Sequence, residues 1–199
     1  MANVALLCVG DVLLVGGYKG HGKDTFFDFL AGTRRDVQFE IKSNDMVCTL
    51  PKVAYTRYAF ADALKEQVAK LLNVTVSYID KHKDTPIAEG IVYTPYNSNA
   101  VIKTIRDVLI DYATHKRKNN PYYFAALVQK QIEQSGDSIV VVTDFRFVEE
   151  YVYLLTTLSS RRRIFTARVN RTGAPIPAKD EVSEHKLNDF HFQFLINNI

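Results

Sequence analysis

Residues 12–30 hold the feature that most limits how this chain can fold. Residues 12–15 form a short, continuously apolar run, and a glycine-rich segment follows it directly. From Asp24 to Leu30 the apolar residues recur at helical spacing. A short apolar run that leads through a glycine loop into a helix is typical of α/β domains, in which such a run forms a buried parallel strand. The segment therefore predicts an α/β fold.

The loop Gly17–Thr25 has the chemistry of a phosphate site. Its glycines allow several backbone N–H groups to converge on phosphate oxygens, and the N-terminus of the next helix adds partial positive charge. We expect Lys23 to reach the β- and γ-phosphates of ATP. The residues expected to contact this nucleotide are Gly17, Gly20, His21, Gly22, Lys23, Asp24 and Thr25. A plain glycine turn with an exposed lysine is the alternative.

The loop departs from the strict phosphate-loop pattern at one position. That pattern has Ser or Thr directly after the lysine, whereas here Asp24 follows Lys23 and Thr25 comes one residue later. The shift makes direct ligation of Mg²⁺ by a hydroxyl in the usual position less expected. We assign Thr25 and Asp144 as the residues that serve the metal ion.

Strand and helix patterns alternate along the rest of the chain. Strands are predicted at residues 139–143, 164–169 and 192–196, and helices at 62–72, 100–115, 121–135 and 148–158. Residues 33–58 are predicted to form a hairpin or an irregular excursion, and residues 73–100 to be rich in loops. Alternation of this kind predicts a central parallel sheet flanked by helices, within a single domain over residues 1–199.

Composition and charge narrow the function classes. Two isolated cysteines among 199 residues argue against a disulfide scaffold and a zinc site and favour a reducing cytoplasm. A net charge of +3 is too small to indicate a nucleic-acid partner. The apolar run at residues 4–15 lacks a basic segment before it and is too short to cross a membrane. Monomer and homodimer both stay open.

Four segments together resemble one enzyme family. The loop at residues 20–25 resembles that of the adenylate-kinase-like small kinases, and more closely that of the deoxynucleoside monophosphate kinases of phages and large DNA viruses. Residues 60–66, 142–150 and 183–198 resemble further segments of the latter family, in the same order. Animal phosphomevalonate kinase belongs to the same structural relatives, and residues 115–124 resemble one of its segments.

The resemblance implies a P-loop kinase fold with an acceptor-binding helical region and a short lid near residues 171–182. It implies ATP- and Mg²⁺-dependent transfer of a phosphoryl group to a (deoxy)nucleoside monophosphate, and a viral or phage source with the host cytoplasm as compartment. One alternative is a kinase of another small phosphomonoester, such as phosphomevalonate. The other is a degenerate phosphate-loop module that binds nucleotide as a structural or interaction protein.

The expected chemistry needs cations that neutralise the repelling phosphates. Ligands of open α/β sheets bind at the carboxyl ends of the strands, and this places Asp144 and Arg146 in the site. The predicted catalytic residues are Lys23, Asp144, Arg146 and Arg171. The predicted acceptor-binding residues, in part from the resemblance, are Lys65, Arg106, Arg117, Arg146 and Glu149. The alternatives are a surface ion pair of Arg146 with Glu149 or Glu150, a helix cap at Asp144, and solvated charges elsewhere.

Overall fold

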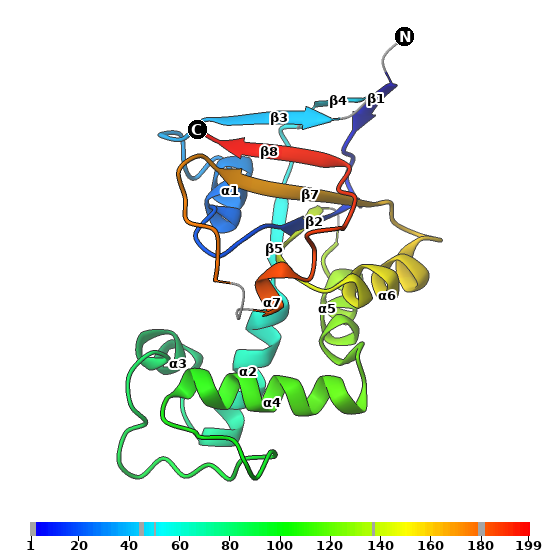
Figure 1. Cartoon of the computed structure of the whole chain (residues 1–199). Helices are drawn as coiled ribbons and strands as arrows, with labels where there is room; N and C mark the ends of the chain where they lie inside the picture. Colours follow the sequence, from blue (N-terminus) through cyan, green and yellow to red (C-terminus); the bar gives the residue numbers. More distant parts are fainter. Residues whose placement is uncertain (1–2, 44–45, 50, 137, 179–181) are drawn as a thin grey trace. The chain divides into compact units, whose positions relative to one another are not determined.

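The computed structural model describes residues 3–43, 46–49, 51–136, 138–178 and 182–199 (Figure 1). The chain divides into two compact units. Unit 1 comprises Met1–Ala59 and Val128–Ile199 and contains the strands, and unit 2 comprises Phe60–Leu127 and is mainly helical.

A six-stranded sheet forms the centre of unit 1. Its order is β3-β8-β7-β2-β6-β5, and the strands are β2 (Val12–Gly16), β3 (Phe39–Ser43), β5 (Tyr55–Tyr58), β6 (Ile139–Phe145), β7 (Ile164–Arg171) and β8 (Phe194–Asn198). Every pairing is parallel except that of β3 with β8. The predicted α/β class is thus confirmed, and the sheet carries one antiparallel strand at its edge.

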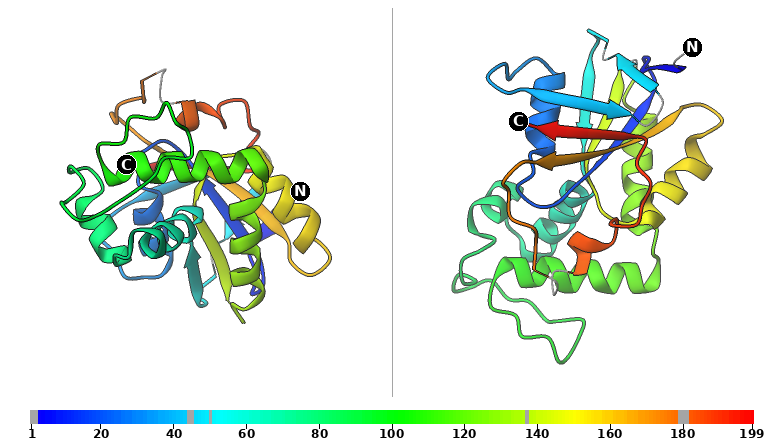
Figure 2. Two further views of the ribbon diagram at one scale, coloured as in Figure 1. Left: turned by 90° about the horizontal axis from the view of Figure 1, so that it is seen from below. Right: turned by 45° about the horizontal axis from the view of Figure 1, so that its top comes forward.

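The sheet is buried on both faces because helices cover both. Helix α1 (Lys23–Leu30) lies on one side and α6 (Val148–Leu158) on the other (Figure 2). Leu13 and Val15 of β2 pack in the cluster that contains Phe26 of α1. Their neighbours Val12 and Leu14 face the opposite way, and both are 0% exposed. Each such buried side chain contributes about 1.5–3 kcal/mol to stability.

Several parts of the chain differ from the sequence prediction, and the helix predicted at 100–115 is observed at Ile105–Asn119. The excursion at residues 33–58 contains β3, β4 (Met46–Thr49) and β5. Strands β3 and β4 belong to different sheets, since β4 pairs in parallel with β1 (Asn3–Leu6), so they do not form a hairpin. The loop-rich stretch contains a short helix, α3 (Val76–His82), and the last strand starts at residue 194 instead of 192.

Unit 2 is organised by the packing of α2 (Phe60–Leu72) on α4 (Ile105–Asn119). Helix α4 begins with a capping box in which Thr104 accepts from the backbone N–H of Asp107, and Asp107 accepts from that of Thr104. The hydroxyl of Tyr112 donates to the side chain of Gln67 and links the two helices. Helix α5 (Tyr123–Glu133) runs from unit 2 into unit 1.

Among the helices that the structure describes, none combines the length and the apolar character needed to cross a membrane.

Candidate phosphate-binding site

The loop between β2 and α1 depends on glycine at two positions. Gly17 has φ 138°, and a Cβ added there would lie well inside contact distance of the carbonyl oxygen of Val169 on β7. Gly22 caps α1 in the left-handed conformation with φ 93°. A side chain would strain the backbone at either residue. The glycines let the loop turn tightly against β7 and lead into the N-terminus of α1.

Lys23 is folded back onto the loop that precedes it. Its Nζ donates to the carbonyl oxygens of Gly17 at 2.6 Å and Tyr18 at 2.8 Å, and the residue is only 8% exposed. The lysine expected to reach phosphates therefore satisfies two backbone carbonyls of its own loop. Lys23 is thus not the exposed lysine that the alternative of a plain glycine turn supposes.

Charged side chains from distant parts of unit 1 surround the ammonium group. Burial lowers the pKa of Lys23 from 10.5 to about 8, and the positive charge of Arg146 acts in the same direction. The carboxylates of Glu184, Asp144 and Asp24 oppose this lowering of the pKa. The predicted residues Asp144 and Arg146 thus act on the charge of Lys23, together with Glu184, for which no role was predicted.

Asp24, the residue in the expected hydroxyl position, is bound to the neighbouring strands. Its Oδ1 accepts from Nε of Arg57 on β5 at 3.0 Å and from the hydroxyl of Thr143 on β6 at 2.9 Å. Asp24 therefore fixes the start of α1 to two strand ends. Thr25, the next residue of the helix, is half-buried.

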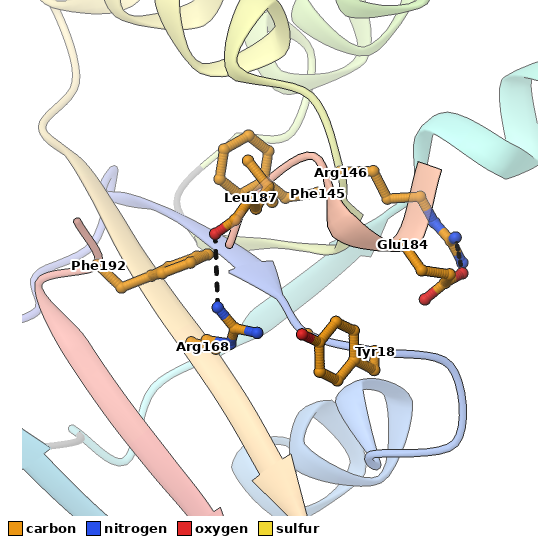
Figure 3. A pocket seen from close by; sticks show the side chains of 8 residues that line it. Tyr18, Phe145, Arg146, Arg168, Glu184, Leu187 and Phe192 are labelled. Carbon is orange, nitrogen blue, oxygen red and sulfur yellow. Dashed lines mark hydrogen bonds and ion pairs between the residues drawn. The ribbon is translucent and has the colours of Figure 1, made fainter. Parts of the chain in front are cut away.

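Arg146 follows β6 and is held at both its backbone and its side chain. Its backbone N–H donates at 3.1 Å to Glu150, a residue of α6 that is only 3% exposed. Its guanidinium forms an ion pair with Glu184 of α7 (Val182–His185), as Figure 3 shows. The expected alternative, an ion pair with Glu149 or Glu150, is not the one observed. Glu149 is exposed in the first turn of α6.

The segment after α7 lies against the loop and β7. Asn188 accepts from the hydroxyl of Tyr18 at 2.8 Å and from Arg168 at 3.4 Å. Arg168 also donates to the Leu187 carbonyl at 3.4 Å and lies over the Tyr18 ring (Figure 3). Between these groups the cavity measures about 10 Å³, which is about the space for one water molecule.

The predicted lid begins beside the loop. The backbone N–H of Arg171, the last residue of β7, donates to Nδ1 of His21 at 3.3 Å. Burial lowers the pKa of His21, so the imidazole is neutral near pH 7 and its proton resides on Nε2. The side chain of Arg171 is exposed. Of the predicted lid, residues 179–181 lie outside the described residues.

Unit 2 contains three of the predicted acceptor-binding cations and brings two of them together. Lys65 pairs with Asp80 at 2.7 Å, and Asp80 is also within 3.9 Å of Lys83. The Lys83 carbonyl accepts from the backbone N–H of Arg106 at 2.8 Å. Lys65 and Arg106 therefore lie around the C-terminal end of α3.

Arg117 is far from this pair. It lies about 16 Å further along α4 than Arg106, given the rise of a helix. Its guanidinium is positioned over the ring of Phe124, 4.9 Å from the centroid.

Sequence reasoning assigned no role to Glu184, Tyr18 or Asn188. Glu184 belongs to the C-terminal segment that carries a family resemblance, and this was the available signal; Asn188 lies between the residues that carry it. Neither models of known protein families nor curated proteins match this sequence. Within the described part of the chain, no group of three His, Cys, Asp or Glu side chains could hold a metal ion.

Proposed function

We propose that this protein is a P-loop kinase that binds ATP at the loop Gly17–Thr25 and transfers its γ-phosphoryl group to a (deoxy)nucleoside monophosphate. The observation that supports this most is the position of Lys23, which is buried at the N-terminus of α1 with Asp144 and Arg146 acting on its charge. Loop amides, a lysine and an arginine at one end of a parallel sheet are the groups that phosphoryl transfer requires.

The proposed site offers oxygen groups, which Mg²⁺ prefers as ligands. Asp144 lies close enough to Lys23 to raise the pKa of that lysine, and Thr25 presents a hydroxyl in the first turn of α1. The Oδ1 of Asp24 already binds Arg57 and Thr143. We assign the ion to Asp144 and Thr25. When bound, Mg²⁺ neutralises charge on the phosphates.

The reaction needs no redox partner. The bond between the γ-phosphorus and the β,γ-bridging oxygen breaks while a bond forms to an oxygen of the acceptor phosphate, which gives ADP and a diphosphate. Lys23 and Arg146 stabilise the negative charge that the β-phosphate gains. For the acceptor, Lys65 and Arg106 of unit 2 are the proposed cations. Lys65 pairs with Asp62 and Asp80, and Arg106 pairs with Asp84.

A substrate panel tests the proposal. The protein is incubated with ATP and Mg²⁺ and each of the eight common nucleoside and deoxynucleoside monophosphates, with phosphomevalonate as a ninth acceptor, and diphosphate products are quantified. Turnover of a nucleotide supports the nucleotide kinase. Turnover of phosphomevalonate alone would assign the other substrate class. ATP binding in calorimetry without transfer to any acceptor would favour the scaffold alternative.

A further inference from the structure

Glu184 is bound by two groups that a phosphate would otherwise use. The backbone N–H of Lys19, in the middle of the loop, donates to its Oε2 at 2.8 Å. The guanidinium of Arg146 pairs with its Oε1 (Figure 3). The side chain of Glu184 is only 5% exposed, whereas that of Arg146 is 33% exposed. A buried carboxylate thus lies against the loop and neutralises its neighbouring arginine.

A loop amide and a guanidinium are the donors that proteins commonly use to bind phosphate. A backbone amide has a single hydrogen, so the Lys19 amide cannot make a full hydrogen bond to Glu184 and to a phosphate oxygen at once. A second anion beside the buried carboxylate would also be repelled. Phosphate binding at these donors therefore requires that the carboxylate leave.

The lysine of the loop is also bound by the protein's own groups. Nζ of Lys23 donates to the carbonyls of Gly17 and Tyr18, and the cavity beside Glu184 measures about 10 Å³. A ligand pocket for a small molecule is commonly about 300 Å³ or larger. The Lys23 ammonium group and the space beside Glu184 are therefore occupied by the protein's own groups.

The attachment of Glu184 allows its release without unfolding of the sheet. It lies in the four-residue helix α7. The next residue, His185, contacts the Tyr18 ring and donates to the Ala178 carbonyl, and the side chain of Leu187 is buried. Since His185 and Leu187 hold the segment, a change of the Glu184 side chain alone can free the Lys19 amide and Arg146. Release of the carboxylate breaks the ion pair with Arg146 and the hydrogen bond from the Lys19 amide.

We infer that Glu184 is an internal anion that occupies the phosphate-binding groups of the loop until the phosphates of the donor nucleotide displace it. The inference rests on the proposed function for the donor site and adds a determinant of its affinity. Part of the binding free energy of ATP is used to expel the carboxylate. Removal of its charge leaves the Lys19 amide and Arg146 ready for the ligand.

Calorimetric titration with inorganic tripolyphosphate, and separately with Mg-ATP, tests this inference in the absence of an acceptor. We expect Glu184→Gln to bind both about ten-fold more tightly than the wild type. Glu184→Ala is the second variant and should show the same direction. The matched control is Glu133→Gln, because Glu133 is exposed in α5 and its change removes the same charge; its affinity should equal that of the wild type.

The outcomes separate this inference from the proposed function. Wild type that binds ATP while both Glu184 variants bind it equally or more weakly would overturn the inference and leave the donor site intact; Glu184 would then support the loop instead of competing with phosphate. If neither the wild type nor the variants bind either ligand, the donor site itself is wrong. Circular dichroism of each variant confirms that the comparison is made between folded proteins.

Discussion

Nζ of Lys23 donates to the carbonyl oxygen of Gly17 at 2.6 Å, so the loop is closed by its own lysine. The same ammonium group donates to Tyr18. A buried lysine that keeps its charge needs such partners, because desolvation favours the neutral form. The geometry makes Lys23 both the main cation of the proposed donor site and a part of the loop structure, and these two roles can be separated by experiment.

Replacement of Lys23 by methionine tests its role in transfer. Methionine has nearly the same length but lacks the ammonium group, so we expect kcat/KM for phosphoryl transfer to fall at least about 100-fold. The measurement is steady-state kinetics with the acceptor identified by the substrate panel. Lys42→Met is the control, since the Lys42 side chain is 60% exposed on the edge strand β3. A Lys23 variant with activity close to that of the wild type would exclude the proposed role.

The pH dependence of stability follows from the lowered pKa of Lys23. Its pKa is about 8 in the folded protein and 10.5 in the unfolded chain. At pH values between these two, the lysine is protonated in the unfolded chain and largely neutral in the folded protein, so the unfolded state binds more protons. The free energy of unfolding of the wild type should therefore rise with pH relative to Lys23→Met. The rise across this window is about 3 kcal/mol.

Urea denaturation of both proteins between pH 7 and 10.5 measures this difference. Other groups titrate in the same range, but their contributions are common to both proteins and cancel. A difference that stays constant, or that falls as the pH rises, would contradict the burial of a charged lysine at this position.

Two glycines of the loop should respond differently to substitution by alanine. At Gly17 a Cβ would collide with the Val169 carbonyl oxygen, whereas at Gly20, with φ 81°, nothing lies within 4 Å. We expect Gly20→Ala to cost only the backbone strain, about 1–2 kcal/mol. Gly17→Ala should cost more and should also abolish ATP binding, because β7 or the loop must shift.

Urea denaturation and calorimetry with ATP measure the two effects. Equal losses of stability for Gly17→Ala and Gly20→Ala would mean that conformational strain alone matters and that close packing on β7 does not.

The sequence predicts the parts of this fold in which local pattern and environment agree. The continuously apolar run of β2, the loop glycines and the apolar spacing of α1 each indicate the observed structure, because a strand buried on both faces needs only apolar side chains. Helix α3 was missed since its seven residues bury only Ile79 and so show no apolar stripe. Its remaining signal was the cap at Thr75, whose side chain accepts from the backbone N–H of Tyr78.

Long-range relationships explain the other differences. The partner of β3 is β8, and no local pattern in residues 39–43 identifies a strand at the far end of the chain. Glu184 and Lys19 are 165 residues apart in sequence. A carboxylate of a four-residue helix gains its role only through the fold that places it on the loop.

The buried carboxylate at the start of β2 should matter for stability and not for binding. Asp11 accepts from Nε and from an Nη of Arg163 at 2.9 and 2.7 Å, and from the backbone N–H of Cys8 at 2.6 Å. We expect Asp11→Asn to lower the free energy of unfolding by about 2 kcal/mol, because the charged partner of these donors is lost. ATP affinity should be unchanged, since the loop lies at the opposite end of the strand.

Asp36→Asn is the matched control for this stability measurement. Asp36 pairs with Arg34, and both side chains are largely exposed, at 68% and 45%. Its loss should leave the unfolding midpoint in urea unchanged. If Asp11→Asn also weakens ATP binding, the ion pair with Arg163 influences the loop through β2, and a purely structural role is excluded.

Arg106→Ala tests whether the cations of unit 2 bind the acceptor. Nε of Arg106 pairs with Asp84, and its backbone N–H binds the Lys83 carbonyl, so Arg106 is held at the start of α4 at both its side chain and its backbone. If the acceptor phosphate binds there, loss of the guanidinium should raise KM for the acceptor about 10- to 100-fold. KM for ATP should stay within about two-fold of the wild-type value, because the donor loop is intact.

Lys118→Ala is the control for this prediction. It removes an exposed cation from the same helix and should change neither KM value. An unchanged acceptor KM in a folded Arg106→Ala protein would assign acceptor binding to other residues. An equal rise of both KM values would show that Arg106 stabilises the protein as a whole.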